Sequence, residues 1–445
     1  MRHLPKPVWI LSIGRFLSEI GTGFTVFYGP IVFVNQIGLS ATDVGVAVGV
    51  ASIGGIFARI LSGSLCDSSW GTKRTLLLSG LVSTIGSFLL VMTHDFRSLL
   101  LGNLFAGMGL GIYWPASEAT IAATADHSQH RDAYTLARFA DNLGLGLGVI
   151  SGSALVSIEN AYKYLFAIDG ISYLLFTIIA AIALPHIRRI QHDEAPSHVA
   201  SRWFKALGDR GLLLYLAINV GFTVYVSQIQ ATLPLYLNNV IPSMSGLTLT
   251  PESIGALFTG HIILCAVLQL PISRAIKSLS HVRALSLSAA IWGLGFFSIW
   301  ALSLAQLLPV TIAIVALAIF ALAIVSYTPS ASAFVALMAP DELRGIYLSL
   351  NSLCWAMGYA IGPPLGGMAI DAGGRTAIGF WLLMAVSSVG LMLALYLLGR
   401  WFARSGRGKK QTQAAIVAPE AIAEPDDAGS ECEAAAPPSP SGGRS

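Results

Sequence analysis

Ionisable side chains occur inside long apolar stretches of this sequence, where a charge is costly unless it is paired or functional. Those that attract attention are Arg15, Glu19, Arg59, Glu118, Arg138, Asp141, Asp169 and His261. Arg15 and Glu19 are one helical turn apart, so they could pair on one face of a helix. We predict a proton or charge network made of Arg15, Glu19, Glu118, Arg138, Asp141 and His261. The alternative is mutual neutralisation that only holds helices together.

Two of these residues have a plainer interpretation. His261 could change its protonation state near neutral pH, but a neutral histidine bonded to a neighbouring helix is the simpler explanation. Asp169 is expected nearer the outer face, where it would be solvated.

At 1.5 Å per residue, Arg15 and Glu19 lie roughly 10–17 Å inside a helix that starts near Val8. The network is therefore expected in the cytoplasmic half of the membrane.

The composition indicates that a lipid bilayer surrounds these residues. The chain has 445 residues, of which 54% are hydrophobic and 11% charged, against roughly 25% charged residues in soluble domains. The net charge of +3 gives no support to nucleic-acid binding. Cysteines stand at Cys66, Cys265, Cys354 and Cys432 without metal-ligand spacing, so we expect no metal site, disulfide framework or cofactor.

About 20 apolar residues are needed to cross the hydrocarbon core, and windows of this length predict an all-α membrane protein of about twelve transmembrane helices in two six-helix bundles. The predicted spans are 8–35, 42–65, 75–93, 98–124, 134–157, 162–184, 211–237, 253–276, 284–304, 307–338, 346–370 and 377–402. The predicted domains are an N-terminal bundle (1–184), a cytoplasmic linker (185–210), a C-terminal bundle (211–402) and a disordered cytoplasmic tail (403–445). Part of the linker, from Ser201 to Leu207, could lie on the membrane surface as an amphipathic helix.

Basic residues in the connecting loops predict the orientation. Alternate loops and both termini carry most of the Lys and Arg, whereas the other loops carry only Arg97, Lys163 and Arg375. Both termini are therefore expected in the cytoplasm, with the protein in the cell (plasma or inner) membrane. The two halves also resemble each other, because Tyr113-Trp-Pro-Ala-Ser and Tyr327-Thr-Pro-Ser-Ala occupy equivalent spans. Such parallel repeats are typical of transporters.

The loop after the second span carries a motif made of Gly63, Leu65, Asp67, Gly71, Lys73 and Arg74. It resembles the signature of the major facilitator superfamily, although one extra residue separates Asp67 from Gly71. The segments Pro340–Gly345 and Ile361–Gly367 are similar to other motifs of that family. The resemblance implies a conformational latch at Gly63, Asp67, Gly71, Lys73 and Arg74.

The run from Arg138 to Gly148 resembles, in part, the drug:proton antiporter branch, whereas Asn103 stands where that branch has an arginine. In the family, spans one, four, seven and ten line the substrate cavity. The resemblance therefore implies a cavity lined by Phe24, Tyr28, Tyr113, Trp114, Tyr225, Gln228, Gln230, Ser326 and Tyr327. Packing of these side chains between helices is the alternative.

A secondary active transporter is the function that these features favour. We expect it to move a small organic solute by alternating access, with proton-coupled efflux, and to work as a monomer. A solute importer of the same superfamily and a transporter-like sensor or receptor without net transport remain as alternatives. A membrane-embedded enzyme would need a catalytic motif such as His-Glu-x-x-His or Gly-x-Ser-x-Gly, and the sequence contains neither.

Overall fold

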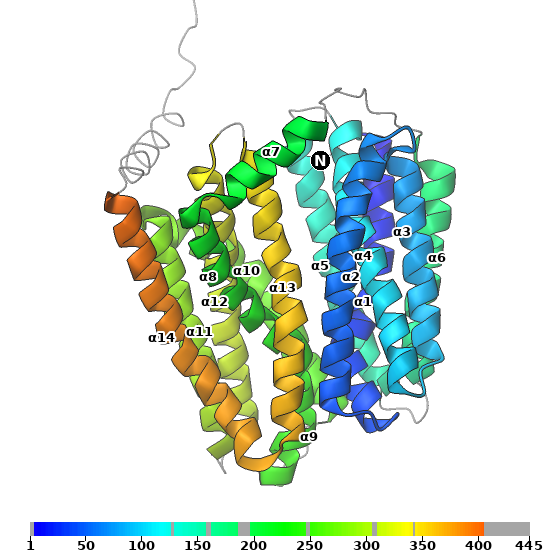
Figure 1. Cartoon of the computed structure of the whole chain (residues 1–445). Helices are drawn as coiled ribbons and strands as arrows, with labels where there is room; N and C mark the ends of the chain where they lie inside the picture. Colours follow the sequence, from blue (N-terminus) through cyan, green and yellow to red (C-terminus); the bar gives the residue numbers. More distant parts are fainter. Residues whose placement is uncertain are drawn as a thin grey trace, which may run out of the picture. The chain divides into compact units, whose positions relative to one another are not determined.

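The computed structural model describes residues 4–125, 129–156, 162–185, 196–245, 250–304, 309–340 and 343–404, and all regular elements in these ranges are helices (Figure 1). They are α1 (Lys6–Asn35), α2 (Ala41–Asp67), α3 (Gly71–Val91), α4 (Phe96–Thr124), α5 (His130–Val156), α6 (Tyr162–Ala183), α7 (Pro196–Leu207), α8 (Arg210–Ser227), the π-helix η2 (Gln228–Thr232), α9 (Leu233–Ser245), α10 (Pro251–Ala275), the 3₁₀ turn η3 (Ile276–Ser278), α11 (His281–Leu304), α12 (Pro309–Met338), α13 (Arg344–Asp371) and α14 (Gly374–Arg404).

Residues 1–400 form one compact unit, and residues 401–445 form a second unit. The second unit is described only for 401–404, the last turn of α14. From residue 405 onward the predicted tail lies outside the described residues. The predicted division of the remaining chain at 184 and 211 stays a prediction.

Nine of the described helices are long and apolar enough to span a membrane, or ten when the bent helix around Pro271 is counted as one span. The predicted twelve spans also include α5 and α13. The lower hydropathy of these two helices has a physical reason. Helix α5 carries the charged residues Arg131, Asp132, Arg138 and Asp141, and α13 is rich in Gly, Ser and Pro, which are less apolar than Leu or Ile. The structure thus agrees with an all-α membrane fold, while the twelve spans are supported in part.

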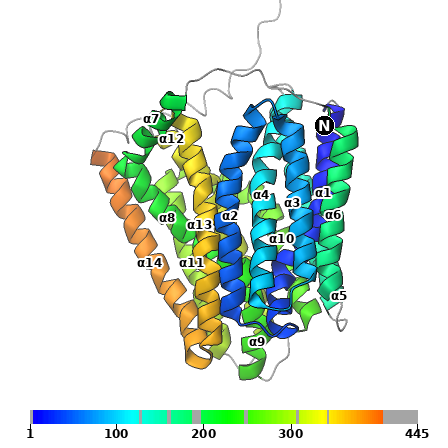
Figure 2. The ribbon, with the colours of Figure 1, turned by 45° about the vertical axis from the view of Figure 1, so that its right-hand side comes forward.

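The first six helices pack mainly on each other. Within this half α2 and α3 contact α4, and α1 contacts α5 and α6. In the other half, α8 contacts α13, and α12 contacts both α10 and α11. The two halves meet where α2 lies beside α13 (Figure 2). They also meet where α5 contacts α10.

The amino-terminal face is the end where α1 begins at Lys6 and α2 ends at Asp67, and the opposite face is the end where α1 ends at Asn35 and α13 ends at Asp371.

The prolines of the predicted repeat, Pro115 and Pro329, lie at interior positions of α4 and α12. The stretch from Arg210 to Pro242 forms one span that is interrupted by η2, and such π-turns often occur at functional sites.

Candidate functional site

A cavity of about 500 Å³ lies between the two halves of the chain. Helices α1, α2, α3, α4 and α6 supply most of its described lining, and the other half contributes residues of η2 and α13. The wall combines large aromatic side chains with a few charged or polar ones, namely Trp114, Trp355, Tyr359, Glu19, Arg59 and Asp169. A mostly apolar cavity of this size with a few polar groups is typical of a site for a small organic molecule.

Glu19 is the charged residue of this lining that the fold leaves without a partner. It is only 6% exposed, and it lies on α1 where α5 packs closely, with Gly144 facing its Cβ atom. Within the described parts of the chain, its carboxylate forms no hydrogen bond and no ion pair. A buried carboxylate normally has such a partner, so Glu19 is a candidate for binding a ligand or a proton from the cavity.

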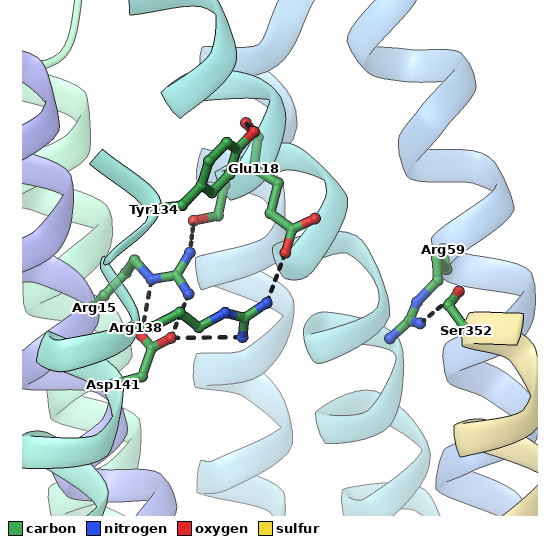
Figure 3. A network of polar contacts seen from close by, with 8 residues as sticks. Arg15, Arg59, Glu118, Tyr134, Arg138, Asp141 and Ser352 are labelled. Atoms are coloured by element: carbon green, nitrogen blue, oxygen red, sulfur yellow. Dashed lines mark hydrogen bonds and ion pairs between the residues drawn. The ribbon is translucent and has the colours of Figure 1, made fainter. Parts of the chain in front are cut away.

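Arg15, one turn before Glu19, is fully paired with other residues (Figure 3). Its Nε and Nη2 donate to Oδ1 and Oδ2 of Asp141 over 2.8 and 2.5 Å, and its Nη1 donates to Ser117 Oγ over 2.5 Å. The guanidinium carbon also lies 5.0 Å from the centre of the Trp114 ring. The predicted Arg15–Glu19 pair is therefore not formed, because the bidentate geometry favours Asp141.

Glu118 and Arg138, two members of the predicted network, form an ion pair. Arg138 Nη2 lies 2.9 Å from Glu118 Oε1, and Arg138 Nη1 lies 3.8 Å from Asp141 Oδ2. Glu118 and Arg138 are about half exposed, whereas Arg15 is buried. Four of the six predicted network residues therefore form one chain of contacts along α1, α4 and α5, and Glu19 stands beside it without joining it.

Arg59 and Asp169 add two further charged groups to the cavity wall. Arg59 on α2 reaches toward α13, where its Nη1 lies 3.5 Å from Ser352 Oγ (Figure 3). Asp169 on α6 is 4% exposed, and its Oδ2 accepts a hydrogen bond from Ser87. The expectation that Asp169 would be solvated near the outer face is wrong, since α6 turns it toward α1 and α3. An acidic residue within an apolar span is the sequence signal that indicates such burial.

The contacts of His261 favour the simpler interpretation, a histidine that is hydrogen-bonded to a neighbouring helix. Its Nδ1 lies 2.9 Å from the carbonyl oxygen of Leu317 on α12, and it is absent from the described lining of the cavity. The side chain is buried at the contact between α10 and α12. Its membership of a proton network stays a prediction that this geometry does not favour.

The structure places the nine predicted cavity residues in two groups. Trp114 and Gln230 line the cavity. The other seven are buried between helices, and five of them form hydrogen bonds there: Tyr28 to Val149, Tyr225 to Ser387, Gln228 to Gly362, Ser326 to Leu322 and Tyr327 to Asn219. Phe24 contacts Gly152, and Tyr113 packs edge-on against Phe176. A role in substrate binding stays a prediction for all nine, and packing is the observed role of these seven.

The motif after α2 forms the turn into α3. Gly71 has a φ angle of +78°, which a residue with a side chain rarely adopts. Lys73 Nζ donates to the carbonyl oxygens of Ala181 and Leu184 at the end of α6, over 2.8 and 2.7 Å, and Arg74 lies over the Trp70 ring. The Asp67 side chain lies outside the described part, and Gly63 faces open space. The latch role of these residues stays a prediction.

The described residues provide no group of three or more His, Cys, Asp or Glu side chains that could hold a metal ion. Among the described cysteines, Cys66, Cys265 and Cys354 form no disulfide bond, and Cys432 lies outside the described ranges.

Comparison with known proteins identifies the class. The family model of the Major Facilitator Superfamily matches residues 11–241 and 236–425, and the chain therefore belongs to this family of membrane transporters. The family and the relatives that the chain matches are transporters and not enzymes. A relative in Bacillus subtilis (strain 168), the uncharacterized MFS-type transporter YhjO, is 23% identical over 85% of this chain and 91% of that protein.

Further relatives agree with this membership. The multidrug resistance protein MdtH of Yersinia enterocolitica is 24% identical over 87% of this chain and 93% of its own length. Among solved structures, the nucleoside transporter NupG superposes with a TM-score of 0.73 at 14% identity, covering 88% of this chain and 99% of NupG. The peptide transporter PepTSo superposes with a TM-score of 0.72 at 15% identity, covering 90% and 99%. At these identities the solved structures establish the fold alone.

Proposed function

We propose that this protein is a secondary active transporter that moves a small organic solute by alternating access, in the direction of efflux and in exchange for protons. The observation that carries the proposal is the unpaired carboxylate of Glu19 in a cavity between the two halves. A carboxyl group without an ion pair can bind or release a proton without breaking the helix contacts around it. The same carboxyl group can also contact a solute that enters the cavity.

The neighbouring charges support this assignment by contrast. Arg15 and Asp141 neutralise each other inside the bundle, and Arg138 and Glu118 do so nearer the solvent. A structural role accounts for these four residues, whereas it does not account for Glu19. Efflux is favoured by the similarity to proteins named for multidrug resistance, and the cell membrane is the location that fits such a transporter.

The test uses the full chain in proteoliposomes with an imposed pH gradient. Drugs, sugars, organic acids and amino acids are first screened for thermal stabilisation of the purified protein, and the stabilising compounds are then used as radiolabelled probes. Accumulation driven by an acidic interior indicates exchange against protons. Accumulation driven by an acidic exterior indicates the importer, and no flux of any stabilising probe under either gradient supports the sensor.

Glu19→Gln and Glu118→Gln form a matched pair for the coupling role. Both remove one carboxylate of the N-terminal half, but only Glu19 lines the cavity. We expect Glu19→Gln to abolish flux driven by the pH gradient, while exchange of labelled for unlabelled probe continues. Glu118→Gln is expected to keep both activities. If Glu19→Gln keeps the full response to the gradient, Glu19 is not the coupling group.

A further inference from the structure

Asp371, the last residue of α13, connects the two halves at the opposite face. Its Oδ1 accepts a hydrogen bond from the backbone N–H of Ala41 over 2.9 Å, and its Oδ2 accepts one from Thr42 over 2.7 Å. Ala41 and Thr42 are the first two residues of α2. One carboxylate of the C-terminal half therefore completes the first turn of a helix of the N-terminal half.

The first N–H groups of a helix have no partner within it, and the helix dipole makes this end attractive to a negative charge. In α2 the Asp43 N–H is satisfied within the same half, by Ser40 Oγ over 2.9 Å. The N–H groups of Ala41 and Thr42 depend instead on Asp371. Separating α13 from α2 at this face would break two charge-assisted hydrogen bonds, which are stronger than neutral ones.

Other contacts close the same face. Asn35 at the end of α1 and Asn239 on α9 exchange two amide hydrogen bonds of 2.9 and 2.8 Å. Gly367 lies directly against the Ala41 carbonyl group, so a side chain at 367 would prevent α13 from approaching α2. The halves are thus held together at this end by polar bonds and by close backbone packing.

The other end of the α2–α13 pair is looser. Arg59 and Ser352 approach to 3.5 Å, which is at the limit of a hydrogen bond. Gly63 on α2 and Gly345 on α13 both face open space, with no atom within 4 Å of where a Cβ atom would lie. The pair is therefore tight at the opposite face and open at the amino-terminal face.

We propose that the Asp371 carboxylate is a lock that holds the opposite face closed and is released when that face opens. The inference rests on the proposed alternating access, because a rigid protein would need no lock. Ala41 and Thr42 are the first residues of their helix, and the Ala41 bond to Asp371 is partly buried while the Thr42 bond is exposed, so water can replace Asp371 after release. A bond that water can replace suits a contact that must open repeatedly.

The test measures distances between spin labels in the full chain, purified in lipid nanodiscs without any substrate. One label pair replaces Gln36 and Arg375, which are exposed at the opposite face in the two halves. A second pair replaces Ser69 and Lys277, which are exposed at the amino-terminal face. The background carries alanine in place of Cys66, Cys265, Cys354 and Cys432.

Asp371→Asn is compared with Asp43→Asn. Both remove a negative charge near the start of α2, but Asp43 has no hydrogen-bond partner in α13 within the described residues. We expect Asp371→Asn to raise the population with long Gln36–Arg375 distances about tenfold, which corresponds to about 1.4 kcal/mol. The Ser69–Lys277 distances should become shorter in the same sample, and Asp43→Asn should leave both pairs as in the unmutated background.

Three results would overturn the lock. They are unchanged distances in Asp371→Asn, an equal shift in Asp43→Asn, and a longer distance at both faces, which would mean general loosening instead of alternation. The measurement is independent of solute and proton flux. If the flux assay fails but the distances change as expected, the proposed transport is rejected and the lock stands. If flux is observed but the distances in Asp371→Asn are unchanged, the lock alone is rejected.

Discussion

Removing the carboxylate of Asp141 tests whether the Arg15 pair is the main polar contact inside the N-terminal half. The Arg15 side chain is 1% exposed, so Asp141→Ala leaves a buried cation without its counter-ion. Two charge-assisted hydrogen bonds of about 1.5–3 kcal/mol each are lost. Ser117 Oγ and the Trp114 ring still contact the guanidinium and offset part of this loss. We expect the free energy of unfolding to fall by about 3 kcal/mol.

Glu118→Ala is the matched control for that substitution. It also removes a carboxylate that pairs with an arginine, but the Arg138 and Glu118 side chains are 56% and 45% exposed. Water can solvate the remaining Arg138, so the expected loss is below about 1 kcal/mol. The two variants differ in the burial of the arginine that loses its partner and in the number of bonds that are lost.

Equilibrium unfolding in mixed detergent micelles measures both variants. The double variant Arg15→Met with Asp141→Ala completes the comparison, because it contains no unpaired buried charge, and it should regain more than half of the stability lost in Asp141→Ala. Equal stability of Asp141→Ala and Glu118→Ala would refute the reasoning, since Arg15 would then have water or another anion within reach.

Two further predictions concern helix contact and helix capping. Gly21→Ala places a Cβ atom 2.5 Å from Asp169 Oδ1 and should lower stability by about 1–3 kcal/mol, whereas Gly146→Ala, with nothing within 4 Å, should be neutral in the same unfolding assay. Hydrogen bonds from the Ser98 hydroxyl and N–H lower the pKa of Asp95 below its ordinary value, so its capping contribution is present at neutral pH and is lost as the pH falls through that lowered pKa. The unfolding midpoints of Asp95→Ala and the unmutated protein should therefore differ at neutral pH and converge below about pH 4; a constant difference would contradict this.

Several features of the site followed from the sequence because they depend on local spacing. The Glu118–Arg138 contact joins the end of one helix to the start of the next, so the short connection already places both residues at similar depth. The turn at Gly71 likewise follows from a short motif. The Arg15–Asp141 pair joins residues far apart in the chain, and its geometry depends on the way α1 packs against α5.

The cavity residues show the main limit of sequence reasoning. Span membership implied Tyr113, Tyr225 and Tyr327, but these side chains point between helices. A helix in lipid can be apolar on every side, so its sequence pattern gives little information on the side that faces the cavity. Gln228 and Gln230 both lie in the π-helix η2, but only Gln230 reaches the cavity wall, whereas the Gln228 side chain donates to the Gly362 carbonyl oxygen on α13.

Composition and apolar run length by themselves determined an all-helical membrane protein, because the hydrocarbon core admits long apolar helices with internally satisfied backbones. The ionisable residues within those runs were also visible in the sequence. Only the tertiary structure decided which of them are neutralised, since pairing depends on helix rotation and contact. That arrangement left Arg15 bound to Asp141, and it left Glu19 in the cavity wall without a hydrogen-bond or ion-pair partner among the described residues.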